Sequence, residues 1–75
     1  MQEDGKDIAR LDEQDTDLLN KKGWFLVTYF QSKQGGQGST AYNNAMEKAL
    51  TLKRDVGLRS YVKDDYTFWE VWEHY

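Results

Sequence analysis

The fold of this 75-residue chain is decided by its last ten residues, Tyr66-Thr67-Phe68-Trp69-Glu70-Val71-Trp72-Glu73-His74-Tyr75. They hold five of the eleven aromatic residues of the chain, together with two β-branched residues. Aromatic and β-branched side chains favour the pleated, half-buried surface of a strand. We therefore predict that this segment is the central strand of a sheet, which would tie down the C-terminal residues.

Composition and charge divide the chain into two parts. Residues 1–22 carry seven acids and four bases, a net charge of −3, whereas residues 23–75 carry six of each. We predict an acidic, mostly flexible leader over 1–22, with a short helix near 15–22, and a folded domain over 23–75. No stretch approaches the roughly 18 apolar residues of a membrane span, and the acidic N-terminus is unlike a secretory signal, so a cytoplasmic location is expected.

A strand and a long helix are expected earlier in the chain. Residues 24–31 predict a strand with apolar bulk on both sides. The main helix is expected from Ala41 to about Val56, with Gly57 ending it in a left-handed conformation. Its apolar stripe falls at spacings of three and four residues: Tyr42, Ala45, Met46, Ala49, Leu52 and Val56.

Asp64-Asp65 predicts a two-residue hairpin turn between a strand over Leu58–Lys63 and the C-terminal strand. This register sets Arg59 opposite Glu70, a favourable pairing of opposite charges. The resulting β-α-β-β order predicts an α+β domain with a three-stranded, mostly antiparallel sheet of order 1-3-2. One helix should pack on one face of that sheet.

The second sheet face is the candidate binding surface. We expect the helix to cover the face that holds Trp24, Leu26, Phe30 and Trp69. The opposite face would expose an aromatic patch rimmed by charges, as interaction surfaces often do. Its candidate partner-binding residues are Phe25, Val27, Tyr29, Arg59, Tyr61, Lys63, Phe68 and Trp72, with Glu70 and His74 at the rim.

Two structural roles for this patch compete with the binding of a protein partner. The leader can fold back, so that Leu11, Leu18 and Leu19 cover the face, because a small domain gains from every buried apolar residue. The chain can also self-associate through the face as a homodimer. A third alternative is that the aromatic residues stack the bases of a single-stranded nucleic acid, although the neutral folded part lacks the positive groove that such sites use.

The glycine-rich loop offers an alternative site. Lys33-Gln34-Gly35-Gly36-Gln37-Gly38 resembles the pyrophosphate loop of acyl-CoA-dependent acetyltransferases, which joins a strand to a helix and begins with Gln or Arg. That resemblance implies acyl-CoA binding. The position of the loop between a strand and a helix start also lets the backbone N–H groups of Gly35, Gly36, Gly38, Ser39 and Thr40 hold an anion or a nucleotide phosphate. A plain connecting loop accounts for the same residues, and the lysine of a nucleotide-binding P-loop is absent.

Catalysis has little support in the sequence. There is no cysteine, and His74 is the sole histidine, so neither a metal site nor a nucleophile with its base is indicated. We expect no cofactor and no metal. The interpretation favoured by the sequence is a non-enzymatic protein-binding module, an adaptor or inhibitor, that uses the aromatic sheet face or an exposed strand edge.

Overall fold

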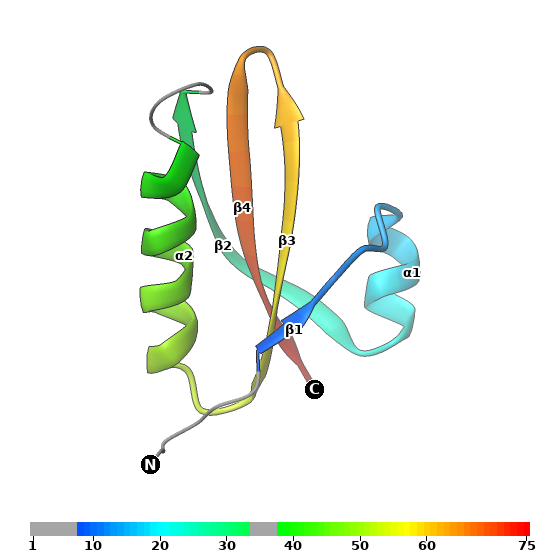
Figure 1. The fold of residues 1–75 in the computed structure, drawn as a ribbon. Coiled ribbons are helices and arrows are strands. Elements are labelled where there is room, and N and C mark those ends of the chain that lie inside the picture. The colour runs from blue at the N-terminus through cyan, green and yellow to red at the C-terminus, as the bar shows by residue number, and fades with distance from the viewer. Residues whose placement is uncertain (1–7, 34–37) are drawn as a thin grey trace.

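The computed structural model describes residues 8–33 and 38–75, which form an α+β fold with a four-stranded mixed sheet and two helices. Figure 1 shows the helices on opposite sides of the sheet. In chain order the elements are β1 (Ile8–Arg10), α1 (Thr16–Lys21), β2 (Trp24–Lys33), α2 (Gly38–Thr51), β3 (Asp55–Lys63) and β4 (Tyr66–His74).

The sheet has the order β1-β3-β4-β2. The three long strands lie in the predicted order, with the C-terminal strand between the other two. The prediction of a three-stranded sheet is wrong, because β1 adds a fourth strand parallel to β3, with Ile8 opposite Val56. The backbone N–H of Leu11 extends this pairing by donating to the carbonyl of Leu58 at 2.8 Å. Three residues are too few to show the alternation by which a strand is predicted.

The predicted helix extends too far toward the C-terminus. Helix α2 ends at Thr51, and Val56, expected on its apolar stripe, lies in β3. Strand β3 begins at Asp55 and not at Leu58, because Asp55 pairs with His74 of β4 and residues 56–58 pair with β4 on one side and β1 on the other. Gly57 is a buried strand residue and does not end the helix in a left-handed conformation.

The hairpin between β3 and β4 confirms the predicted turn and register. Asp64 and Asp65 have φ angles of 53° and 67°, the positive values that a type I′ turn needs at both central residues. Arg59 lies opposite Glu70, as predicted. Local turn chemistry therefore determines how the two strands align.

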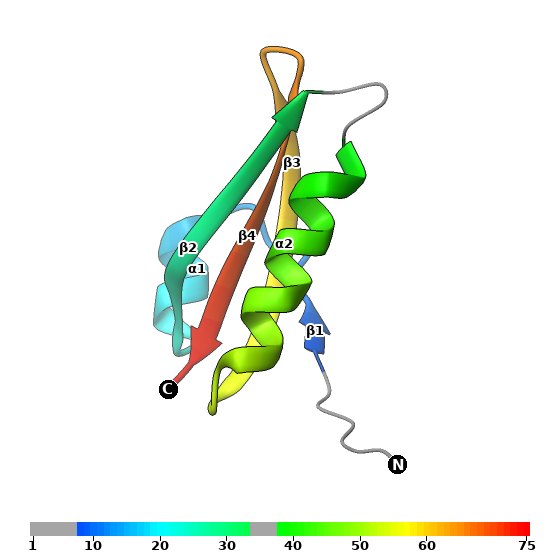
Figure 2. The ribbon, with the colours of Figure 1, turned by 90° about the vertical axis from the view of Figure 1, so that its left-hand side faces the viewer.

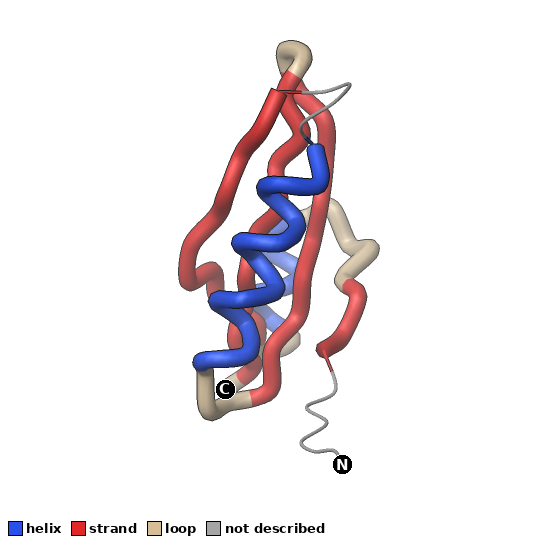
Figure 3. Tube along the Cα trace, turned by 60° about the vertical axis from the view of Figure 1, so that its left-hand side comes forward, coloured by secondary structure: helices blue, strands red, loops and turns tan. Residues whose placement is uncertain are grey.

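Helix α2 packs closely on one face of the sheet (Figures 2 and 3). Ala41, Ala45 and Ala49 are fully buried at intervals of four residues, so one line along α2 carries methyl side chains, and Met46 and Leu52 pack against the core beside it. Such a line lets the helix backbone approach the strands. The core cluster beneath it consists of Ala45, Ala49, Val56, Leu58 and Val71.

A β-bulge interrupts β2. Leu26 lies opposite Trp72, but Thr28 lies opposite Val71, so Val27 is an extra residue in β2. Side chains alternate between the two faces of a strand. One inserted residue therefore shifts this alternation, so that the residues before the bulge lie on the faces opposite to those that an unbroken alternation with the residues after it would give. The bulge therefore splits β2 into two segments with opposite alternation.

The faces predicted for the first residues of β2 are wrong for this reason. Trp24 and Leu26 share the face of Trp72, opposite α2, and Phe25 lies on the α2 side. Phe30, beyond the bulge, packs against the helix-side core as predicted. An unbroken alternation cannot describe a bulged strand.

Candidate functional site

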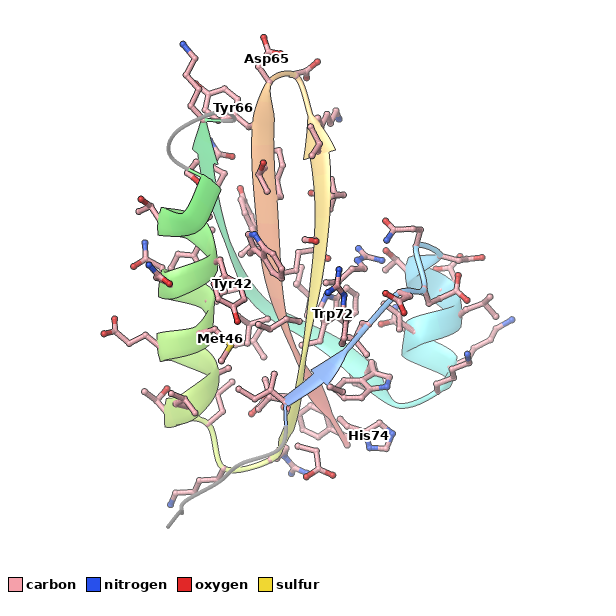
Figure 4. The ribbon with its side chains drawn as sticks, in the orientation of Figure 1. Tyr42, Met46, Asp65, Tyr66, Trp72 and His74 are labelled. Carbon is pink, nitrogen blue, oxygen red and sulfur yellow. The ribbon has the colours of Figure 1, made fainter. Side chains whose placement is uncertain are left out.

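The sheet face opposite α2 has a covered half and an open half. The covered half faces α1, and Figure 4 shows Trp72 on that side of the sheet. Leu19 of α1 and Trp72 of β4 are 2% and 1% exposed. Leu11 lies so close to Gly57 that a Cβ atom there would be 2.8 Å from its Cγ. The N-terminal segment thus occupies half of the face that the sequence offers to a partner.

Helix α1 begins and ends with local signals. The Asp15 carboxylate caps its N-terminus, accepting from the backbone N–H groups of Asp17 at 2.9 Å and Leu18 at 3.4 Å. Gly23, with φ of 96°, turns the chain from α1 into β2. A side chain at Gly23 would meet the ring of His74 at 3.0 Å. This helix lies within the segment where the sequence predicts a short one.

Arg59 joins the N-terminal segment to the sheet. Its Nε donates to Glu70 Oε1 at 2.6 Å, and Trp72 Nε1 donates to the same oxygen at 3.0 Å. Arg59 Nη1 donates to the backbone carbonyls of Glu13 and Gln14, both at 3.2 Å. The guanidinium also lies over the Trp72 ring, 4.9 Å from its centroid. A charged network thus holds the chain that enters α1 against the sheet.

This network removes two expected binding residues from the open surface. Arg59 is 6% exposed and Trp72 only 1%. A buried guanidinium needs its hydrogen-bond partners, so Arg59 is committed to the fold. The sequence contains no signal for these contacts, since two of the acceptors are backbone carbonyls.

The open half carries three aromatic rings from three strands. Tyr61 of β3 stacks on Phe68 of β4, with centroids 4.9 Å apart and planes 7° apart. Tyr29 of β2 contacts Phe68 from the other side, with centroids 6.0 Å apart. Tyr29 is 53% exposed. We call these three residues the aromatic ladder; all three belong to the predicted site.

Polar and basic residues adjoin the aromatic ladder. Strand pairing sets Gln31 opposite Phe68, and sets Lys33 and Lys63 on either side of Tyr66. Gln31, Lys33, Lys63 and Tyr66 are all exposed. Lys63 was expected in the site, whereas the other three were missed, although Gln31 and Lys33 follow Tyr29 at every second position.

Burial raises the pKa of the Tyr61 hydroxyl above its ordinary 10.0, and the Glu70 carboxylate raises it further. The Arg59 guanidinium opposes this shift by favouring the phenolate. Like an ordinary tyrosine, Tyr61 is protonated near neutral pH, and it presents a neutral hydroxyl that can donate a hydrogen bond.

The remaining two predicted site residues lie apart from the ladder. Phe25 is on the α2 side, where its ring meets that of Tyr75 at 5.6 Å between centroids. Val27 is the bulge residue of the edge strand β2. Both side chains are exposed, at 45% and 38%.

Part of the predicted anion site lies outside the described residues. Gly35 and Gly36 lie outside the described residues. Gly38 is the first residue of α2, and Ser39 and Thr40 follow it in the helix. One amide of the first turn of α2 is engaged, since Ala41 N–H donates to Ser32 Oγ of β2 at 3.4 Å.

Two hollows lie beside β1. One, of about 180 Å³, opens between α2 and the β1 end of the sheet, and Figure 4 shows Tyr42 and Met46 pointing toward it from α2. Its lining is Ile8, Ala9, Arg10, Tyr42, Met46, Leu58 and Trp69. The other, of about 490 Å³, is lined by Ile8, Ala9, Trp24, Asp55, Val56 and His74.

His74 has structural contacts. Its Nε2 lies 2.8 Å from the Lys22 carbonyl, and the Trp24 ring meets it edge-on at 4.9 Å between centroids. Within residues 8–33 and 38–75, no group of three His, Cys, Asp or Glu side chains is placed to hold a metal ion. Over the same residues, neither helix has the length and apolarity to cross a membrane.

Comparison with protein-family models, curated proteins and solved structures finds no match for this chain.

Proposed function

We propose that this domain is a non-enzymatic module that binds another protein through the open half of the sheet face opposite α2. The observation that carries the proposal is the aromatic ladder, in which Tyr29 is exposed and Phe68 and Tyr61 are partly exposed while the adjoining half of the face is covered. Aromatic side chains supply large contact areas at small entropic cost and dominate binding hot spots. The ladder is already ordered by its ring contacts, which lowers the cost of binding further.

The composition of the half-face supports a partner with apolar groups and an acidic rim. Lys33 and Lys63 lie on either side of Tyr66 at the hairpin end. Glu70, beside the ladder, is buried in its pair with Arg59, and the exposed acids at this end of the sheet, Asp64 and Asp65, lie in the hairpin turn beyond the lysines. Carboxylates on a partner would meet the two lysines while apolar side chains meet the rings.

Single-stranded nucleic acid is the second candidate, favoured by the same two lysines. Base stacking needs a free ring face. Phe68 lies between Tyr29 and Tyr61 on the strand that separates theirs, so both of its faces have ring neighbours. Two lysines also provide little of the phosphate neutralisation on which such affinity depends. The protein partner accounts for the half-face better.

The test is capture on the immobilised chain from extract of the cells that express it, with and without nuclease. Tyr61→Ala and Phe68→Ala should each abolish capture of a stoichiometric protein that survives nuclease. Leu50→Ala is the matched control, because Leu50 is 59% exposed on α2, away from the half-face. Circular dichroism should first show that all three variants are folded.

Three results contradict the proposal. Capture that disappears with nuclease supports the nucleic-acid candidate. Capture that survives both ladder substitutions places the binding surface elsewhere. Capture of nothing by a folded wild-type chain, over extracts from several growth conditions, leaves the half-face without a protein partner.

A further inference from the structure

The free edge of β2 points to a second site of association, which does not depend on the proposed function. We propose that β2 pairs antiparallel with β2 of a second copy of this chain, so that two four-stranded sheets form one of eight strands. Strand β2 is the last in the order β1-β3-β4-β2. Nine of its ten residues pair with β4, and no strand of the described residues pairs with its other side.

The backbone along this edge is available. Roughly half of the N–H and C=O groups of an antiparallel edge strand point away from its neighbour. In the described residues, no backbone hydrogen bond joins residues 24–33 to anything outside the sheet. A strand added beside β2 would satisfy these outward groups in one step.

Exposed apolar side chains occur on both faces of this one strand. Phe25, on the α2 side, is 45% exposed, and Leu26, on the opposite side, is 48% exposed. Val27 at the bulge and Tyr29 on the ladder are 38% and 53% exposed. A partner on either face would reach only part of this set. A strand at the edge puts neighbours beside the side chains of both faces.

The charge on β2 favours a second copy as the occupant. Lys33, at its C-terminal end, is the only charged residue among residues 24–33. Antiparallel self-pairing separates the two lysines by the length of the strands, about 30 Å for ten residues. Each lysine then lies near the start of the second strand, where Trp24 offers an aromatic ring and the nearest like charges, Lys21 and Lys22, belong to the end of α1 and not to the strand. Parallel pairing would set the lysines side by side.

The opposite edge of the sheet explains why the association should stop at two copies. Strand β1 has three residues and covers only positions 56–58 of β3, so this edge consists of two short stretches, β1 and positions 59–63 of β3. Very short edge strands resist further pairing. Antiparallel pairing of identical strands is a two-fold contact that uses the same surface on both copies, so it closes. Because its axis is normal to the sheet, the two ladders would share one face, with Tyr29 nearest the junction.

The first test uses the absence of cysteine from the chain, which makes every introduced thiol unique. Single cysteines along β2 would be oxidised mildly and the dimer fraction measured on non-reducing gels. Antiparallel pairing brings equivalent positions together only near the middle of the strand, so we expect disulfide-linked dimer at one or two central positions. The scan covers Trp24, Val27, Thr28, Tyr29, Gln31 and Lys33, with Val62 of β3 as an exposed control.

The second test is sedimentation equilibrium of the full chain over micromolar to millimolar concentrations. Wild type should reach twice the chain mass, and Leu26→Lys should weaken dimerisation by about tenfold or more, because it puts charge into an apolar edge. Leu50→Lys is the control, since Leu50 is comparably exposed on α2. Tyr61→Ala, which tests the ladder, should leave the dimer intact.

The proposal is overturned by any of three outcomes: a wild-type chain that stays monomeric at millimolar concentration, a dimer that is insensitive to Leu26→Lys, or crosslinking strongest at Trp24 or Lys33. A monomer that captures a protein through the ladder would reject self-pairing and leave the proposed function standing.

Discussion

Arg59 links the N-terminal segment of this structure to the sheet. It pairs with Glu70, lies over the Trp72 ring and donates to the carbonyls of Glu13 and Gln14. A charge buried to this degree is stable only with all of its partners in place. The residue that the sequence places at the rim of a binding surface therefore organises the covered half of the sheet.

Loss of the Glu70 charge should destabilise the fold strongly. Glu70→Gln keeps the shape of the side chain but leaves the Arg59 guanidinium uncompensated, and we expect a loss of about 3 kcal/mol in the free energy of unfolding. Asp12→Asn is the matched control, because the Arg10–Asp12 pair spans 3.7 Å at side-chain exposures of 79% and 89%. That change should cost under about 1 kcal/mol. Urea unfolding measures both, and equal losses would show that the buried network adds nothing.

The raised pKa of Tyr61 predicts a loss of stability in alkali. The folded chain holds the Tyr61 proton more tightly than the unfolded chain, whose tyrosine has the ordinary value of 10.0. The resulting stabilisation is complete below about pH 10 and is lost as the pH rises through the folded-state pKa. Urea midpoints at pH 8 and pH 11 should fall less for Tyr61→Phe than for wild type. Gln31→Ala, an exposed neutral control on the same face, should follow wild type; an identical fall for Tyr61→Phe would refute the assignment.

At the scale of elements, each secondary structure combines a local signal with a tertiary one. Asp15 and Gly23 define the ends of α1, but the covered face of the sheet keeps so short a helix in place. The turn at Asp64-Asp65 aligns β3 and β4, and their pairing continues to Asp55 opposite His74.

A substitution in the hairpin turn should raise the stability of the fold. Asp65 has a φ of 67°, a region that costs most L-residues about 1 kcal/mol and glycine nothing. Asp65→Gly should therefore stabilise the chain by roughly 0.5 kcal/mol, since type I′ turns prefer glycine there. Lys63→Gly, two residues earlier in β3, should instead destabilise it by a similar amount. Thermal unfolding compares the two variants, and a lower midpoint for Asp65→Gly would contradict the turn assignment.

At the scale of the whole molecule, the two ends of the chain and its middle meet in one sheet. Strand β1 pairs with β3, and β4 lies between β3 and β2. Helix α2 covers one face, and α1 with its preceding segment covers half of the other (Figure 1). Among the residues that the structure describes, this arrangement leaves accessible the open half-face, the β2 edge and the part of the β3 edge beyond β1.

This arrangement predicts that residues 23–75 do not fold alone as well as the full chain does. Without residues 1–22, Trp72 is uncovered and Arg59 loses the carbonyls of Glu13 and Gln14. The loss should reach several kcal/mol, on the order of the whole stability of a small domain. A chain of residues 12–75, which lacks β1 but keeps the Arg59 contacts, should lie between the two. Urea unfolding and binding of a dye for exposed apolar surface measure this, and equal stability of 23–75 and the full chain would refute it.

The sequence by itself determined the hairpin, its register, the presence of α2 and the order of the three long strands. Those features depend on local chemistry, namely a turn that accepts positive φ at Asp64 and Asp65 and apolar residues at helical or strand spacing. The ladder residues Tyr29, Tyr61 and Phe68 were found by the same alternation. Only the tertiary structure decided the rest. The bulge at Val27 reversed the faces of Trp24 and Leu26, and backbone carbonyls bound Arg59 and so covered Trp72. These features depend on backbone groups, which every residue carries, and on segments far apart in the chain, so no sequence pattern predicts them.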